Sequence, residues 1–377
     1  MRDGIFERIF LPGLAFKAAV IGGGYATGRE LASFFLPSGA VGGFKAIALA
    51  TVIWSLVCAL TFAFAFETRS RDYRTFFKAL LGRGWFAYEV AFLLALVVIL
   101  AVFAAAAGEI GSALFGLSGY AGAIGLAVAI AIVASWGNDA VEGLFKYVSI
   151  LLYGTYLLFF IFALLRFGDR IATGLADPAP STGWIVGGTT YALYNIIGAI
   201  VILPVTRHMR SRRDAVAAGL LCGPLAMLPA ALFFLAMVGF SDTLLVHPLP
   251  SDFLLSQLEM PWFRVLFQLM ILAAMLESGV GGVHAINERL SNMVAARRKR
   301  EAGLNQIQRL ASTSFILLFA VVVADHVGLV ALIADGYRWL AYIFLLVYVA
   351  PLLSLGAAHL WRTRRPLAHG ANSGTDE

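Results

Sequence analysis

The sequence has few charged residues and few cysteines. Charged side chains make up 13% of its 377 residues and hydrophobic ones 60%, whereas an average soluble domain has about 25% charged residues. Both cysteines, Cys58 and Cys222, fall within apolar runs, so no disulfide framework is expected. The six histidines lack the spacing of metal ligands. These absences exclude an ordinary soluble domain, and no metal site is expected.

Motifs of nucleotide-driven proteins are missing as well. There is no P-loop with its lysine, so ATP is not expected to drive an activity. The run Gly22-Gly23-Gly24 has no strand before it, which argues against a dinucleotide site. The net charge of +6 comes from short basic loops, which are typical of membrane topology signals rather than of a nucleic-acid partner. We therefore expect no enzyme, no cofactor and no nucleic-acid binding.

Long apolar runs dominate what is present. A helix of about 20 residues crosses a hydrocarbon core of about 30 Å. Ten such spans can be drawn: 9–36, 41–66, 86–114, 119–136, 140–166, 183–206, 214–240, 262–290, 308–325 and 328–359. The first is too long for the apolar region of a signal peptide and is expected to remain as a span. The fold class is therefore an all-α polytopic membrane protein of about ten transmembrane helices.

The basic residues indicate how the spans are oriented. Lys and Arg gather in alternate connections, whereas the connections around 37–42, 117–119, 241–261 and 325–327 contain none. This asymmetry predicts cytoplasmic N- and C-termini in a cytoplasmic (inner) membrane. The exception is the outer loop 166–183, which carries two arginines. The polar tail 362–377 is expected to be disordered in the cytoplasm.

Two spans are interrupted near mid-depth. Gly22, Gly23 and Gly24 lie in the middle of the first span, and each glycine costs a helix interior about 1 kcal/mol. Freed backbone groups persist in a bilayer only where they line a cavity or hold a ligand. The sixth span carries Gly187, Gly188 and a central Asn195, although glycine is also a common packing residue. Because five is odd, spans one to five (1–166) and six to ten (167–361) form two inverted repeats.

An unwound helix offers two kinds of polar group. Its free N–H groups carry positive partial charge and its free carbonyls negative partial charge, so a small zwitterion suits both. Tyrosines near the breaks can supply aromatic walls or cation–π faces. Each tyrosine taken alone favours a packing role, and it is their placement at the two breaks that favours binding. The candidate substrate-binding residues are Gly22, Gly23, Gly24, Tyr25, Ala26, Thr27, Tyr191, Tyr194 and Asn195.

Charged residues within spans are costly and are functional candidates by default. At 1.5 Å per residue, Lys146 lies roughly 9 Å, and Lys17 about 12 Å, from the cytoplasmic ends of their spans, with Glu277 at a similar depth. A lysine and a glutamate could meet there, for ion coupling or as a structural ion pair. On the outer side, Arg29 and Asp335 each lie roughly 10 Å into a span.

These features resemble a known architecture. Two inverted five-helix repeats with broken first helices are similar to the LeuT fold of the amino acid-polyamine-organocation superfamily. More narrowly, several motifs resemble a bacterial membrane-protein family called YkvI over nearly the whole chain. They are Gly22-Gly-Gly-Tyr-Ala-Thr-Gly-Arg-Glu30, Tyr194-Asn195, Glu277-Ser-Gly-Val-Gly281, Asn287-Glu-Arg-Leu290 and Gly336-Tyr337.

The resemblance implies roles for several of these residues. In sodium-coupled proteins of this fold, a sodium ion lies between helices one and eight on carbonyls and hydroxyls, and Ser278 would be the single hydroxyl candidate. Lys146 resembles the lysine that takes this place in proton-coupled relatives, which favours proton over sodium coupling. Arg29 and Asp335 resemble an extracellular gate pair. The alternative is that Arg29 binds an anionic substrate directly, with Glu30 as its local partner.

We therefore expect a secondary active transporter of a small polar organic solute, most of all an amino acid or related zwitterion. Spans one, two, six and seven would rock against the rest to give alternating access, with H+ as the favoured coupling ion. The alternatives are a sodium-coupled symporter of the same fold and a membrane nutrient sensor or ligand-gated pore that does not transport. Substrate identity, direction of transport and oligomeric state are not determined by the sequence.

Overall fold

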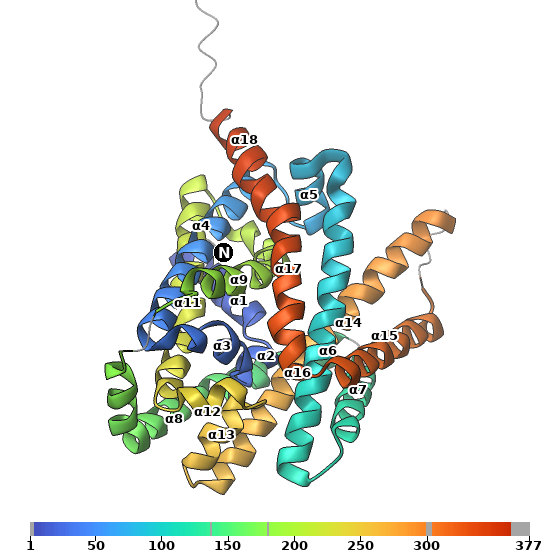
Figure 1. Ribbon diagram of the computed structural model, residues 1–377. Coiled ribbons are helices and arrows are strands. Elements are labelled where there is room, and N and C mark those ends of the chain that lie inside the picture. Colours follow the sequence, from blue (N-terminus) through green and yellow to red (C-terminus); the bar gives the residue numbers. More distant parts are fainter. Residues whose placement is uncertain (1–3, 136–137, 179–180, 299–303, 363–377) are drawn as a thin grey trace, which may run out of the picture.

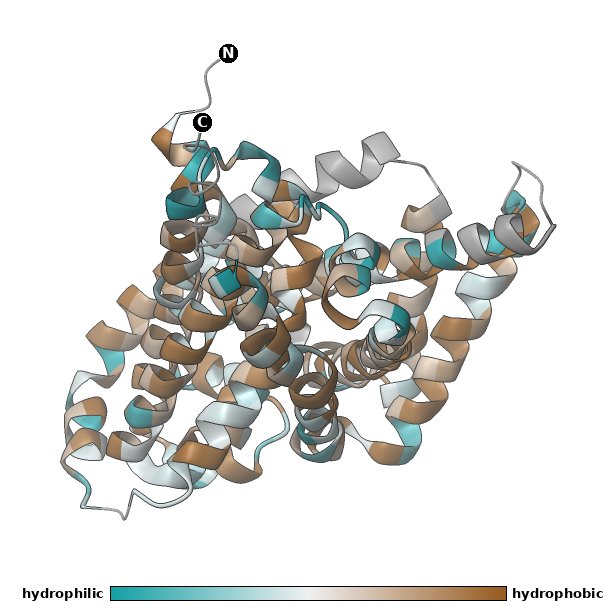
Figure 2. Cartoon of the chain, turned by 90° about the horizontal axis from the view of Figure 1, so that it is seen from above, coloured by the Kyte–Doolittle hydropathy of each residue, from teal (hydrophilic) through white to brown (hydrophobic). Residues whose placement is uncertain are grey.

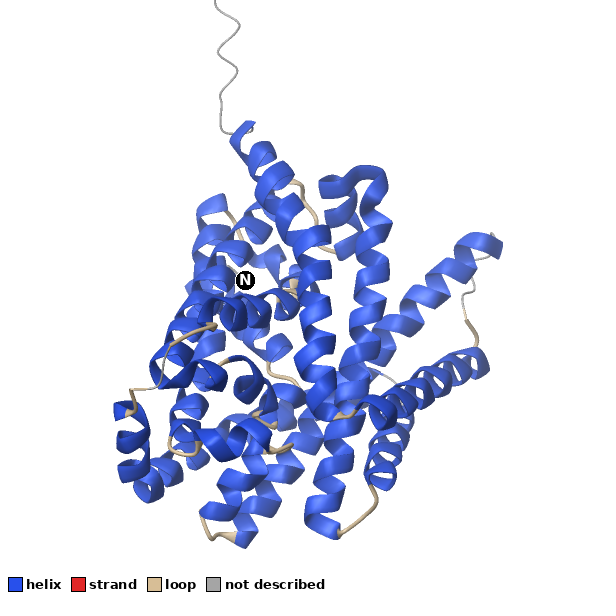
Figure 3. Cartoon of the chain, in the orientation of Figure 1, coloured by secondary structure: helices blue, strands red, loops and turns tan. Residues whose placement is uncertain are grey.

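The protein is built from helices. The computed structural model describes residues 4–135, 138–178, 181–298 and 304–362, which form helices and loops without a strand (Figure 3). A helix satisfies its backbone polar groups within one segment, which is what a bilayer requires. Apart from Arg362, the predicted disordered tail 362–377 lies outside the described residues.

The first segment is divided as the glycines predict. A π-helical turn at Phe6–Phe10 leads into α1 (Leu11–Val20), α2 (Gly23–Ala26) and α3 (Arg29–Phe34). The first half of the chain continues with α4 (Gly39–Glu67), α5 (Tyr73–Leu81), α6 (Phe86–Phe115), α7 (Gly119–Ser135) and α8 (Asn138–Ala176).

The second half begins with the other interrupted segment, α9 (Trp184–Asn195) and α10 (Ile197–Val201). It continues with α11 (Arg212–Val238), the short helices α12 (Ser241–Val246) and α13 (Pro250–Gln257), then α14 (Pro261–Arg298) and α15 (Gln306–Val327). Finally, α16 (Leu329–Ala331), α17 (Tyr337–Phe344) and α18 (Ala357–Arg362) are joined by π-helical turns into one long helix (Figure 1).

The predicted spans are recovered as helices. Among the described residues, eight helical stretches are long and apolar enough to cross a membrane, and they coincide with predicted spans two, three and five to ten. The fourth span is the shorter apolar helix Gly119–Ala134. Two boundaries were wrong: α8 continues to Ala176 through part of the predicted outer loop, and α14 continues to Arg298. Backbone hydrogen bonding extends these helices beyond their apolar runs.

The helices form two groups. In one, α4 packs against α9 and α11, and α1 also packs against α11. In the other, α6 packs against α7 and α15, and α14 packs against α7 and α8. Apolar residues cover most helical turns (Figure 2), and large side chains such as Leu165, Phe315 and Leu346 are exposed. Exposed apolar surface of this extent is expected of a lipid-facing protein.

Candidate functional site

The first segment is interrupted twice. Helix α1 ends at Val20, Ile21 leaves the helical region with ψ 82°, and α2 then forms a single turn. The second interruption lies at Gly28, whose φ of +76° is readily adopted only by glycine. A Cβ at Gly28 would also approach the ring of Phe233 to 2.6 Å. The chain therefore changes direction on both sides of α2.

The polar groups freed by these interruptions find partners within the protein. The Thr27 hydroxyl donates to the Gly24 carbonyl at 2.8 Å. The Thr27 carbonyl accepts from the backbone N–H of Ser251, in α13, at 2.9 Å. Sequence reasoning placed Thr27 as a substrate hydroxyl, but in this conformation its polar groups bond within the chain. The loop that carries α13 is thus attached to the break.

The sixth segment is interrupted only at Ile196, which keeps helical dihedral angles (φ −63°, ψ −17°). Side chains bond the carbonyls just before it. The Trp54 indole donates to the Ala192 carbonyl at 2.9 Å, and the Asn195 amide donates to the Tyr191 carbonyl at 3.3 Å. The backbone at this break therefore departs less from helical geometry than the backbone at the first.

A cavity of about 340 Å³ lies between the two interrupted segments. Its lining comes from α1, α3, α6, α9, α10, α14 and α17, and it includes five predicted site residues: Gly22, Tyr194, Asn195, Glu277 and Ser278. The other predicted binding residues do not line it. Buried around it instead are Gly24, Tyr25, Ala26, Thr27 and Tyr191, while Gly23 begins α2.

Glu30 is the lining residue that sequence reasoning missed. It is 4% exposed, and its carboxylate accepts a hydrogen bond from the Tyr194 hydroxyl, which joins the two interrupted segments. Gly24 leaves the space for it, because a Cβ there would collide with the Glu30 Oε1. Sequence reasoning treated Glu30 only as a local partner for Arg29. Its position two residues after the break was the signal, since any intramembrane acid is a functional candidate.

Aromatic rings surround this carboxylate. The rings of Tyr194 and Tyr337 stack with centroids 4.3 Å apart, and Tyr191 meets Tyr194 edge-on at 5.7 Å. Among the described residues, the buried hydroxyls of Tyr25, Tyr156 and Tyr191 have no hydrogen-bond partner. Buried polar atoms are nearly always paired, so these hydroxyls are suited to hydrogen bonds with a ligand or water.

Arg29 faces the outer connection. It is 3% exposed, and its guanidinium donates to the carbonyls of Leu245 at 3.1 Å and His247 at 2.8 Å. The predicted gate partner, Asp335, is exposed and lies 3.6 Å from Arg338 instead. In this conformation the predicted Arg29–Asp335 pair is therefore not formed.

The predicted coupling residues lie around two smaller cavities. Lys17 lines one of about 160 Å³, with its ammonium 3.5 Å from the centroid of the Tyr153 ring. A pocket of about 30 Å³ beside it lies between α1, α8 and α14 and is lined in part by Tyr153, Glu277 and Ser278. Lys146 belongs to α8, but its side chain lies outside the described residues.

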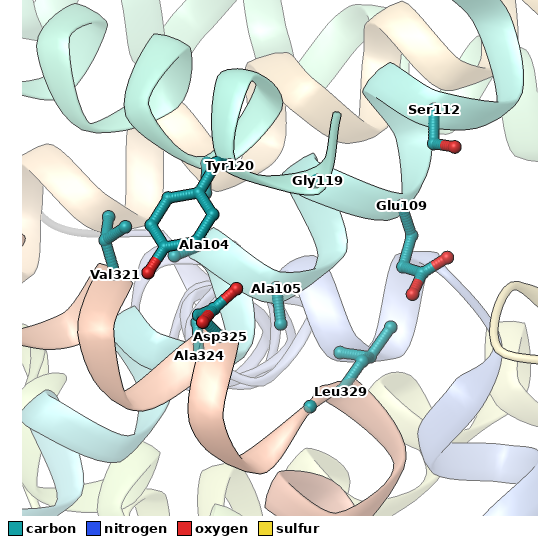
Figure 4. A pocket seen from close by; sticks show the side chains of 13 residues that line it. Ala104, Ala105, Glu109, Ser112, Gly119, Tyr120, Val321, Ala324, Asp325 and Leu329 are labelled. Atoms are coloured by element: carbon teal, nitrogen blue, oxygen red, sulfur yellow. The ribbon is translucent and has the colours of Figure 1, made fainter. Parts of the chain in front are cut away.

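Another cavity, of about 260 Å³, lies between α6, α7, α15 and α16. Glu109 from α6 and Asp325 from α15 line it together with Tyr120 from α7 (Figure 4). None of the predicted site residues lines it. It therefore places a second set of carboxylates apart from the two breaks.

No family model matches the chain, and no curated protein matches its sequence. Solved structures do resemble it. A Na+-coupled sialic acid symporter has a TM-score of 0.62 at 15% identity, over 92% of this chain and 78% of that one. The Eremococcus coleocola manganese transporter has a TM-score of 0.61 at 15% identity, over 91% and 77%.

The structure of MhsT in complex with L-phenylalanine has a TM-score of 0.56 at 15% identity, over 93% of this chain and 87% of that one. The chain has the LeuT fold. The fold class expected from the two interrupted segments is thereby confirmed. Membership of the YkvI family stays a prediction based on the motifs.

Proposed function

We propose that this protein is a secondary active transporter and that its solute binds in the cavity between the interrupted segments. The observation that carries this proposal is the coincidence of both breaks with one cavity of about 340 Å³. Discontinuous helices meeting at mid-depth are the usual site of solute binding in such transporters. The similar structures are those of a sialic acid symporter, a manganese transporter and a protein in complex with L-phenylalanine. The fold therefore supports transport without selecting a solute.

The conformation fits one state of an alternating-access cycle. Ala18, Ala19 and Val201 line the cavity on the half of the molecule that holds the N-terminus, and all three are exposed. On the opposite side, the Arg29 bonds and the Ser251–Thr27 bond hold the outer loop against the break. With both termini in the cytoplasm and the inner membrane as the location, as the basic loops predict, this arrangement supports an inward-facing state.

The packing suggests which helices move. One packed group contains α1, α4, α9 and α11. These helices belong to spans one, two, six and seven, the spans that we expect to rock against the rest. Arg8 and Asp214 tie the start of this first segment to α11 through hydrogen bonds of 2.9 and 2.6 Å. We infer that this group rocks as one body and that the inverted repeats divide near residue 166.

We favour protons as the coupling ion. Glu277 lines both the central cavity and the small pocket between α1, α8 and α14, and no ion pair or hydrogen bond to it occurs among the described residues. Lys146 and Lys17 are the proposed basic partners in coupling. Sodium is the alternative, because the small pocket also contains the Ser278 hydroxyl and one similar structure is Na+-coupled.

The test is uptake into proteoliposomes under an imposed pH gradient or sodium gradient. Uptake that follows the pH gradient and is lost in Lys146→Ala, with exchange retained, supports proton coupling. Uptake that follows sodium and is lost in Ser278→Ala supports the alternative. Tight solute binding without accumulation under either gradient would contradict transport and favour the nutrient sensor. An amino acid or related zwitterion is the solute class proposed from the sequence.

A further inference from the structure

We propose that the solute is an amphiphilic amine, and that its ammonium group binds the Glu30 carboxylate in exchange for a proton. This inference rests on the transporter proposed above and revises its solute class. It differs from the expected zwitterion, because it requires a cationic group on the solute and no carboxylate.

The cavity is acidic and otherwise apolar. Two carboxylates line it, Glu30 from α3 and Glu277 from α14, and none of the described lining residues is basic. An amino acid would bring a carboxylate into this environment without a cationic side chain to receive it. A cation without a carboxylate matches the two acids directly.

Glu30 has no cationic partner among the described residues. Its neutral polar partners are the Tyr194 hydroxyl and the Asn195 amide, while the guanidinium of the neighbouring Arg29 is turned to the outer-loop carbonyls. A buried carboxylate without a counter-ion is unfavourable by several kcal/mol. Glu30 is therefore neutralised in one of two ways: by a proton when the site is empty, or by a ligand cation.

The groups around Glu30 favour this exchange of a proton for a ligand cation. Those that face it, from the elements packed around it, are Tyr25, Tyr156, Tyr191, Tyr194, Tyr337 and, across the cavity, Glu277. Phenols stay neutral in the physiological pH range. Other charged groups near α3 have their own partners, since Asp252 bonds Arg264 at 2.7 Å and Asp335 lies near Arg338. A change of charge at this end of the cavity therefore belongs to Glu30.

The rest of the lining suits an apolar body. The stacked Tyr194–Tyr337 pair presents aromatic surface beside the carboxylate, and Phe103 adds a further ring to the cavity lining. Aromatic faces attract cations as well as apolar groups. With a volume of about 340 Å³, the cavity has the size of a site for a small organic molecule.

Binding is balanced in charge. When one ammonium ion binds, Glu30 releases one proton to the water on the same side, and on the other side a proton from water displaces the amine. One amine cation then crosses the membrane for each proton that crosses in the opposite direction. No net charge is moved by this exchange.

The experiment compares compounds that share a body and differ only in charge. Two sets are used: 2-phenylethylamine, L-phenylalanine and 3-phenylpropionate, and tryptamine, L-tryptophan and indole-3-propionate. Binding to the full-length protein in nanodiscs is measured between pH 5 and 9, and uptake is measured in proteoliposomes. We expect the amine of at least one set to bind at least about tenfold more tightly than its partners. As the pH is lowered into the range where Glu30 is protonated in the free protein, the affinity for the amine should fall about tenfold for each pH unit.

Three variants sharpen the test. Glu30→Gln should abolish both amine binding and its pH dependence, whereas Glu30→Asp should retain weaker, pH-dependent binding. Glu109→Gln removes a carboxylate from the separate cavity of Figure 4 and should change neither. Size-exclusion profiles and thermal melting confirm that each variant is folded.

The outcomes separate the two proposals. Preference for the amino acid or the acid, binding by none of the amines, or pH-dependent amine binding that survives in Glu30→Gln would overturn the inference. Uptake of an amino acid would do so while leaving the transporter intact. Amine binding without uptake under any gradient would instead contradict transport and leave the assignment of Glu30 standing.

Discussion

The two interrupted segments differ in what holds them open. In the first segment, Gly28 has a left-handed conformation. Arg29 bonds the outer-loop carbonyls, and Ser251 of α13 bonds the Thr27 carbonyl beside the break. In the second, Ile196 remains helical and two neutral side chains bond the carbonyls before it. The first break also carries the buried acid, while the second supplies the tyrosine that binds it. The first segment is thus suited to bind charge, and the second to form a wall of the cavity.

Filling the space beside Glu30 should have the largest effect on the first segment. In Gly24→Ala, the new methyl group meets the end of the Glu30 side chain, which can move aside and so leave its Tyr194 bond. We expect uptake to fall about 100-fold, which corresponds to the loss of one hydrogen bond to a charged group of about 1.5 to 3 kcal/mol. Thermal stability should change little, because the Glu30 side chain can move into the cavity. Uptake assays and melting curves measure the two effects.

The matched control is Gly125→Ala on α7, where no atom lies within 4 Å of the new methyl group. It should leave uptake unchanged. Wild-type uptake by Gly24→Ala would show that the position of Glu30 does not matter. Recovery in Gly24→Ala/Glu30→Asp, which shortens the acid, would support the contact.

Arg29→Ala tests the outer closure of the first segment. It removes charged hydrogen bonds to Leu245 and His247, each of which contributes about 1.5 to 3 kcal/mol. We expect about 30-fold slower uptake, a net loss of about 2 kcal/mol, because water at the outer loop replaces part of these bonds. Amide hydrogen exchange in α12 should become faster. Arg166→Ala is the control, because its ion pair with Glu259 is exposed and should contribute little.

Asp335→Ala asks whether the predicted gate forms in another conformation. If Arg29 and Asp335 meet during the cycle, the double variant should be no slower than Arg29→Ala alone. If they never meet, Asp335→Ala should be close to wild type and any losses should add. Uptake rates of the two single variants and the double variant decide between these results.

Asn195→Ala probes the second segment and should have a smaller effect. Asn195 lines the cavity, where its amide makes a long hydrogen bond of 3.3 Å to the Tyr191 carbonyl and lies near the Glu30 carboxylate, whose main donor is Tyr194. We expect a rise in KM of about fivefold, corresponding to the loss of one neutral hydrogen bond of about 1 kcal/mol. A loss as large as that in Gly24→Ala would contradict the ranking of the two segments.

Trp54→Phe should have the smallest effect on transport. It removes the indole donor to the Ala192 carbonyl while keeping an aromatic ring against Phe16 and Tyr191. We expect a loss of about 1 kcal/mol in the free energy of unfolding with uptake nearly unchanged. Thermal unfolding in detergent measures the loss of stability, and a large loss of uptake would contradict the ranking of the two segments.

Particular residues show where sequence reasoning succeeds. Gly22 and Gly24 predict the first break because glycine lowers helix stability wherever it lies, and Tyr194 and Asn195 do line the cavity. The contacts of Thr27 and Arg29 are harder to predict. Their partners, the Gly24 carbonyl and the carbonyls near His247, become apparent only once the chain has folded. A hydroxyl or guanidinium near a break has several possible acceptors, and the sequence does not choose among them.

The sequence alone determined the helical spans, the membrane environment and the place of the two breaks, because hydropathy and glycine content act locally along the chain. Only the tertiary structure decided which side chains face the cavity. Successive residues of a helix point about 100° apart, so the neighbours Arg29 and Glu30 face different surroundings. The left-handed turn at Gly28 and the packing of α9 and α17 direct Glu30 to the cavity and Arg29 to the outer loop.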